Sequence, residues 1–183
     1  MTNQSAPLFA DSPYTRLYSK LTLDELNNID RYLQNLLTNE DESLHKTHYF
    51  HDRFENIYLK PGQHQLLDRL MAESLSHCAQ LLNLKPEALH IGYWFNLMQP
   101  GHVTTLHRHD DLDELISGVV YLVVPPCSGD LVIHTEDEKV VLEPKVGNYI
   151  YFDPKTPHEV TRNQSDSYRL SVGMNIGLVD QED

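Results

Sequence analysis

The second half of the chain consists of short segments of β character separated by closely spaced turn signals. The turns are rich in Pro, Gly, Asn and Asp, residues that favour the backbone angles of tight turns. Short strands that recur every ~8–12 residues are typical of a β-sandwich or a jelly-roll barrel. The expected strands are 89–98, 103–107, 115–124, 130–134, 139–143, 148–152, 158–162 and 168–176.

The first half of the chain has helical patterns instead. Residues 1–20 are expected to be irregular. Thr22 and Glu25 match a capping box, and apolar residues at helical spacing follow. A second helix is expected from Gly62 to about Leu82, with one or two short strands between the two helices. The pattern predicts a mainly β, α+β fold in which N-terminal helices support one sheet.

The charge balance limits the partners of the protein. The chain has 14 Lys and Arg against 27 Asp and Glu, a formal charge of −13. This excess repels phosphate groups, so nucleic acid and anionic membranes are not expected as partners. Neither a secretory signal nor a membrane span is visible, and only two cysteines are present, Cys78 and Cys127. A cytoplasmic location is therefore expected.

The last predicted strand has two different faces. Successive side chains of a strand point to opposite sides. One face has Leu170, Val172, Met174 and Ile176, which we expect to pack against the helices. The other face has Arg169, Ser171, Gly173 and Asn175, and polar groups of this kind are expected to line a binding cavity inside the barrel.

Residues 107–111, His-Arg-His-Asp-Asp, form the strongest candidate metal motif. His107 and His109 are two residues apart, as are His109 and Asp111, so each pair points the same way on an extended strand. His158, at the start of a later strand, is the best candidate for a further ligand. Two histidines and a carboxylate with open positions are typical of non-haem Fe(II) sites. Taken alone, the motif also agrees with surface histidines.

Arg169 is the second candidate group, eleven residues after His158. An arginine inside a barrel is costly unless an anion meets it, and its planar fork suits a carboxylate. Ser171 lies on the same face and can donate another hydrogen bond. The alternative is a salt bridge between Arg169 and an internal Asp or Glu.

Taken together, these motifs resemble the Fe(II)- and 2-oxoglutarate-dependent oxygenases, in particular their bacterial and phage branch. The resemblance covers roughly residues 91–177. It implies a double-stranded β-helix over residues 89–178, supported by residues 1–88, within a single domain of residues 1–183. The matching positions are Trp94–Asn96, Gly101, His107–His109, Ser117–Leu122, Ser128–Leu131, His158 and Arg169–Ser171.

The resemblance implies Fe(II) and 2-oxoglutarate as cofactors, with Arg169 and Ser171 binding 2-oxoglutarate. The family usually has His-x-Asp or His-x-Glu, whereas this chain has His109 in the acidic position. The favoured ligand set, which is also the catalytic set, is His107, His109 and His158. The alternatives use a carboxylate: His107 and His158 with Asp110 or Asp111, or His109 and His158 with Asp111.

The expected function is a dioxygenase that uses O₂ and 2-oxoglutarate to hydroxylate a small-molecule or peptide substrate, with release of succinate and CO₂. Asn96, on a strand with Trp94, and Tyr121 are further candidates for cofactor binding. One alternative is a cupin-like three-histidine dioxygenase without 2-oxoglutarate. Another is a non-catalytic metal- or ligand-binding barrel. Exposed strand edges make a homodimer plausible.

Overall fold

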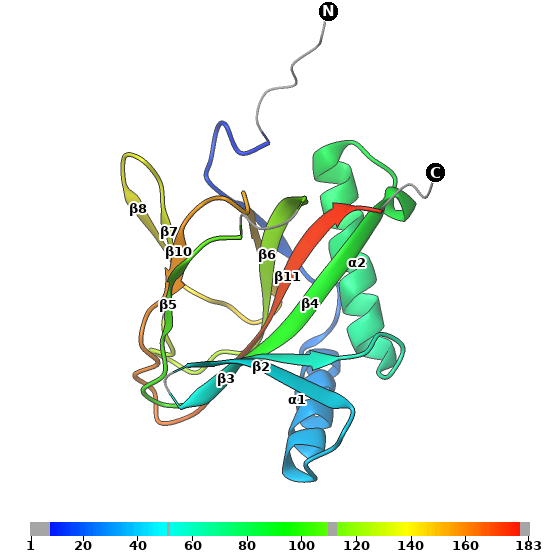
Figure 1. Cartoon of the computed structure of the whole chain (residues 1–183), viewed down its shortest axis with the longest axis vertical. Coiled ribbons are helices and arrows are strands. Elements are labelled where there is room, and N and C mark those ends of the chain that lie inside the picture. Colours follow the sequence, from blue (N-terminus) through cyan, green and yellow to red (C-terminus); the bar gives the residue numbers. More distant parts are fainter. Residues whose placement is uncertain (1–7, 51, 110–112, 180–183) are drawn as a thin grey trace, which may run out of the picture.

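Two antiparallel β-sheets face each other, and two helices cover the outer side of the larger sheet (Figure 1). The computed structural model describes residues 8–50, 52–109 and 113–179. The larger sheet has the order β1-β9-β6-β11-β4-β3-β2 and the smaller sheet the order β5-β10-β7-β8. This arrangement confirms the predicted jelly-roll class, a mainly β, double-stranded β-helix barrel.

The strands from β4 onward agree closely with the sequence prediction. The strands are β1 (Thr15–Tyr18), β2 (Leu44–Phe50), β3 (Arg53–Leu59), β4 (Leu89–Met98), β5 (Thr104–His107), β6 (Glu114–Val123), β7 (Leu131–His134), β8 (Lys139–Leu142), β9 (Asn148–Phe152), β10 (His158–Val160) and β11 (Arg169–Leu178).

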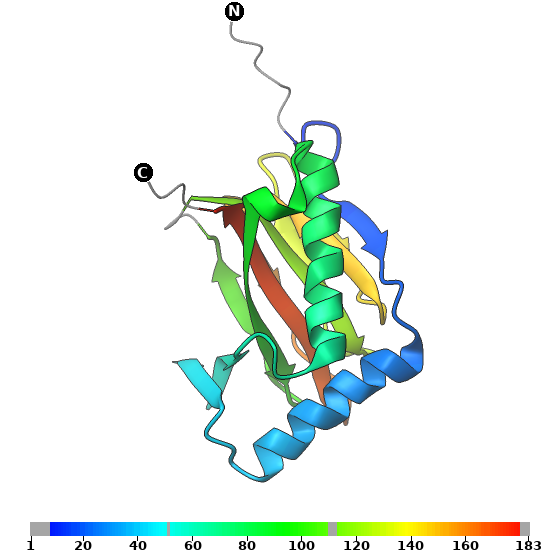
Figure 2. The ribbon, with the colours of Figure 1, turned by 90° about the vertical axis from the view of Figure 1, so that its right-hand side faces the viewer.

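Two helices and a short 3₁₀ turn complete the described chain: α1 (Leu23–Thr38), α2 (Gln65–Leu82) and η1 (Pro86–Ala88). The predicted capping box begins α1, because Thr22 accepts from the Glu25 amide and the Glu25 side chain accepts from the Thr22 amide. Asn83 ends α2 in the left-handed conformation. Figure 2 shows both helices lying across one face of the large sheet. Within the described residues, neither helix is long and apolar enough to cross a membrane.

The main core lies between the helices and the large sheet. The predicted apolar face of β11 belongs to it: Leu170, Val172, Met174 and Ile176 are completely buried against helix residues such as Leu33. A smaller apolar cluster lies inside the barrel and includes Ile133 of β7 and Phe152 of β9. The opposite face of β11 is therefore free to line the space between the two sheets.

The N-terminal region contributes more β structure than its sequence indicates. The expectation that residues 1–20 are irregular is wrong for β1, which pairs with β9 from Thr15↔Tyr151 to Tyr18↔Asn148. This strand depends on a partner at least 130 residues away, so local patterns do not reveal it. The short strands expected between the helices form a complete hairpin, β2–β3, at the opposite edge of the sheet. Both cysteines are free; Cys78 is buried and Cys127 is exposed.

Candidate active site

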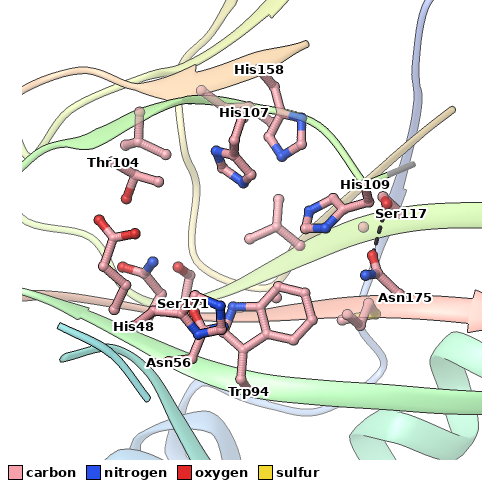
Figure 3. A pocket seen from close by; sticks show the side chains of 18 of the residues that line it. His48, Asn56, Trp94, Thr104, His107, His109, Ser117, His158, Ser171 and Asn175 are labelled. Atoms are coloured by element: carbon pink, nitrogen blue, oxygen red, sulfur yellow. Dashed lines mark hydrogen bonds between the residues drawn. The ribbon is translucent and has the colours of Figure 1, made fainter. Parts of the chain in front are cut away.

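Three histidines from two strands and an adjoining loop meet at one point (Figure 3). His107 ends β5 and lies directly opposite His158, the first residue of β10. His109 follows β5, and its amide donates to the Pro154 carbonyl at 2.8 Å. The ligand atoms of the three side chains all lie within 4.8 Å of one another. The predicted set of His107, His109 and His158 is thus assembled, whereas Asp110 and Asp111 lie outside the described residues.

Backbone contacts fix the orientation of two of these rings. The Nδ1 atom of His107 lies 2.8 Å from the Thr105 carbonyl oxygen, and that of His158 lies 3.0 Å from the Thr156 carbonyl oxygen. A carbonyl only accepts, so each Nδ1 carries the proton and each Nε2 keeps its lone pair. Metal-binding histidines are commonly held in this way. Burial, reinforced by the neighbouring His107, lowers the pKa of His158 to about 3, so its ring is neutral.

A row of polar side chains crosses the inner face of the large sheet. Ser171 of β11 lies directly opposite Asn96 of β4 on one side and Tyr121 of β6 on the other. Directly opposed residues in a sheet point to the same face, so the three predicted cofactor-binding side chains share one wall. All three line the cavity that also contains the three histidines.

Arg169 lies in the same cavity, two residues before Ser171, with only 1% of its surface exposed. Its Nη1 donates to the Gly129 carbonyl at 2.9 Å, and the guanidinium carbon lies 5.0 Å from the centre of the Tyr121 ring. Burial lowers the pKa of Arg169, yet guanidinium stays protonated in proteins. Among the described residues, no carboxylate lies within salt-bridge distance of Arg169. Asp130 attracts the guanidinium only at longer range.

The end of the cavity beside Arg169 has unused hydrogen-bonding capacity. Arg169 Nε and the Tyr121 hydroxyl are buried without a partner in the described part of the chain. A buried cation and a buried hydroxyl without partners are each unfavourable. An anion that accepted from both groups would remove this cost, so the arrangement fits a carboxylate.

Trp94 forms part of the cavity wall between the polar row and the histidines. It lies opposite Gly173 of β11, and a Cβ atom at Gly173 would come within 2.7 Å of the indole ring. Gly173 therefore leaves the space that the indole occupies. The Trp94 ring centre is 5.9 Å from that of His109. The whole cavity has a volume of about 500 Å³.

The sequence analysis missed the part that the β2–β3 hairpin contributes. Arg53 of β3 is buried and links three strands: it donates to Asn96 of β4, to Thr104 of β5 at 2.9 Å, and to Glu55 at 3.1 Å. His48, Phe50, Glu55, Asn56 and Tyr58 also line the cavity. The sequence did contain a signal. Arg53 and Glu55 share a strand face with the apolar residues Ile57 and Leu59, so two charged side chains occupy a face that is otherwise apolar.

Comparison with known proteins agrees with this geometry at the level of fold. No protein-family model and no curated protein matches the sequence. Solved structures do match. A Pseudomonas putida prolyl-4-hydroxylase is 21% identical with a TM-score of 0.76, over 94% of this chain and 96% of that chain. The chain has the fold of the Fe(II)- and 2-oxoglutarate-dependent oxygenases.

Further structures with this oxygenase fold give similar values. The viral collagen prolyl hydroxylase of Paramecium Bursaria Chlorella virus-1, solved with 2-oxoglutarate, is 18% identical with a TM-score of 0.67, over 94% of this chain and 99% of that one. The carbocyclase SnoK from nogalamycin biosynthesis is 14% identical with a TM-score of 0.70, over 96% and 83%. The likeness extends through the N-terminal half, which carries the hairpin and both helices.

Proposed function

We propose that this protein is an Fe(II)- and 2-oxoglutarate-dependent oxygenase. The observation that carries the proposal is the presence, in one cavity, of three convergent imidazoles and a buried Arg169 that forms no salt bridge within the described residues. Imidazole ligands suit iron, and a buried guanidinium suits a dicarboxylate. The shared fold of solved oxygenases supports the same conclusion.

The three histidines would hold Fe(II), with His107 and His158 binding through Nε2. The iron would supply the redox chemistry that couples O₂ and 2-oxoglutarate to substrate oxidation, with succinate and CO₂ as products. Arg169 would bind the distal carboxylate of 2-oxoglutarate, and the Tyr121 and Ser171 hydroxyls would donate to it. Asn96, held by Arg53, would complete this wall. The proposed substrate class is a small molecule or a peptide.

A second candidate is a three-histidine dioxygenase that does not use 2-oxoglutarate. The all-imidazole triad favours it, because the described residues supply no carboxylate ligand at this centre. The buried Arg169 disfavours it, because such an enzyme would leave the guanidinium without a hydrogen-bonded anion. A non-catalytic metal-binding barrel would leave the same guanidinium unexplained.

The test measures metal binding, cosubstrate binding and turnover separately. Without O₂, calorimetry should show one Fe(II) per chain, and 2-oxoglutarate should bind tightly only after Fe(II). After O₂ is admitted, NMR should detect succinate, and its formation should require both Fe(II) and 2-oxoglutarate. O₂ consumption that requires an added organic substrate but not 2-oxoglutarate would favour the second candidate. A protein that binds zinc but neither Fe(II) nor 2-oxoglutarate would contradict the proposal.

The cellular context is also proposed rather than observed. A cytoplasmic location agrees with the two free cysteines. A homodimer would use the exposed edge of β2 or β8, each the last strand of its sheet. Analytical ultracentrifugation distinguishes a monomer from a dimer.

A further inference from the structure

The cavity has a second polar region, to which the β2–β3 hairpin contributes. Figure 3 shows the three metal-site histidines on one side of the cavity and His48, Asn56 and Trp94 on the other. His48 and Asn56 belong to the β2–β3 hairpin, and Trp94 to β4, which pairs with β3. A molecule placed between these two sides would lie next to the metal site. We call His48, Asn56 and Trp94 the hairpin subsite.

Trp94 gives this subsite an apolar surface. Its indole lies over Gly173, with the Tyr58 ring at 6.5 Å and the His109 ring at 5.9 Å between centres. An indole face in this position offers a flat hydrocarbon surface beside the metal site, which suits an aliphatic or aromatic group.

His48 gives the subsite a hydrogen-bond donor. Its backbone has a φ of +57°, a left-handed conformation that is uncommon for residues other than glycine. Its Nδ1 lies 2.7 Å from the Thr47 hydroxyl and 3.4 Å from Asn56 Nδ2. The amide NH₂ of Asn56 can only donate, so Nδ1 accepts and the ring proton is on Nε2. The exposed ring therefore presents an N–H group.

Asn56 gives the subsite an acceptor. Its Nδ2 group donates to the Tyr58 hydroxyl at 3.2 Å as well as to His48. Both amide hydrogens are thereby used. Its Oδ1 atom has no partner within the described residues, so this oxygen can accept a hydrogen from a ligand.

We propose that the hairpin subsite binds an uncharged amide group of the substrate and places the neighbouring hydrocarbon on Trp94, beside the metal site. An amide carries an acceptor oxygen and an N–H donor on the same carbonyl carbon, which matches a donor at His48 and an acceptor at Asn56. As a statement about the oxidised substrate, this inference rests on the proposed oxygenase function. The amide belongs either to a peptide or to a small carboxamide.

Trp94 allows a direct binding test, because it is the only tryptophan of the chain. Its fluorescence is followed during titration of the full chain, both alone and with Fe(II) and 2-oxoglutarate in the absence of O₂. N-acetyl-leucinamide represents a peptide and cyclohexanecarboxamide a small carboxamide. Methyl cyclohexanecarboxylate keeps the carbonyl but has no N–H. Both amides are expected to change the emission to saturation, and the tighter of the two identifies the source.

Two variants test the donor and the acceptor separately. His48→Gly removes the ring but tolerates the left-handed backbone, and Asn56→Ala removes the acceptor. Each should weaken amide binding by about fivefold, as expected for the loss of one hydrogen bond. The ester should bind more weakly than the amide, should respond to His48→Gly, and should be insensitive to Asn56→Ala. Lys46→Ala, an exposed change on the same strand and outside the cavity, should leave all affinities unchanged.

The outcomes separate this inference from the proposed function. If neither amide binds, or if both variants keep the wild-type affinity, the hairpin subsite is wrong, whether or not succinate forms. If amides bind with the expected variant pattern but no 2-oxoglutarate is consumed, the subsite stands and the oxygenase proposal fails. Circular dichroism and melting temperature confirm that each variant is folded.

Discussion

At the residue scale, Arg169 has the most unusual environment in the cavity. A guanidinium is normally solvated or paired, but this one is almost completely buried, and within the described residues it donates to the Gly129 carbonyl. The Tyr121 ring stabilises the cation through its π face, and the phenol hydroxyl has no partner within the described residues. The local structure thus holds a positive charge ready for an anionic ligand.

We predict that Arg169→Met strongly weakens 2-oxoglutarate binding. Loss of one partner of a buried charge pair costs about 2–5 kcal/mol, which corresponds to about 30-fold or more in affinity. Arg169→Lys should keep part of the affinity, because lysine retains the charge but cannot form the planar fork. Calorimetry with Fe(II) present and O₂ excluded measures both effects. Fe(II) affinity is the internal control, and equal 2-oxoglutarate affinity in wild type and Arg169→Met would contradict the assigned role.

Sequence alternation was sufficient to find Arg169 and Ser171, because strand geometry fixes which residues share a face. Alternation alone left three ligand sets open, and the resemblance to the oxygenases favoured His107, His109 and His158, which the structure brings together. Alternation could not find the role of Arg53 or His48. Their position depends on a hairpin that pairs with β4, and His48 reaches the cavity through a left-handed backbone that no periodic pattern indicates.

At the scale of elements, the start of α1 combines a cap with an interhelical ion pair. Glu25 accepts from the Thr22 amide at 2.8 Å and from Arg69 of α2 at 2.8 Å. The Thr22 amide, followed by Arg69, lowers the pKa of Glu25. A carboxyl whose pKa is lowered by folding stabilises the protein above its unfolded pKa, and this contribution is lost as the pH falls through the folded value.

We therefore predict a pH-dependent effect of Glu25→Gln. The variant should be less stable than wild type at pH 7, because glutamine can accept from Thr22 but has no charge for Arg69. The difference should be constant above the ordinary glutamate pKa of about 4.3 and should shrink below it as wild-type Glu25 is protonated. Urea unfolding at several pH values measures this. A difference that stays the same at pH 3 would exclude the charge as its cause, and Glu42→Gln, an exposed change outside the helices, is the control.

Most elements could be predicted because their signals are local. The capping box, the apolar stripes and the Pro and Gly turns each act within a few residues, and the limits of β4 and β9 agree with the prediction. β1 could not be predicted in this way, because its four residues form a strand only through pairing with β9. The third residue of the candidate metal site was also open, because a shift of one residue changes which side chain points toward His107 and His158.

At the scale of the whole molecule, the two sheets differ in how much apolar core supports them, and the candidate metal site lies on the less supported one. The large sheet packs against two helices, whereas β5, β7, β8 and β10 form a small sheet with a limited apolar cluster. His107 and His158 both lie on this small sheet, and His109 follows it. A metal bound to all three would connect β5, β10 and the loop after β5, so it should stabilise the part of the barrel with the smallest core.

Metal binding is accordingly predicted to raise the melting temperature. A ligand that binds only the folded state adds about 2.7 kcal/mol at a concentration 100 times its dissociation constant. For a chain of this length, that corresponds to about 5–10 °C. Calorimetric melting with Mn(II), a redox-stable substitute for Fe(II), measures the shift, and a chelator should reverse it. His158→Ala should abolish the shift, whereas the exposed His45→Ala on the hairpin should preserve it. An equal shift in both variants would mean that the metal binds elsewhere, which would contradict the proposed iron site at His107, His109 and His158.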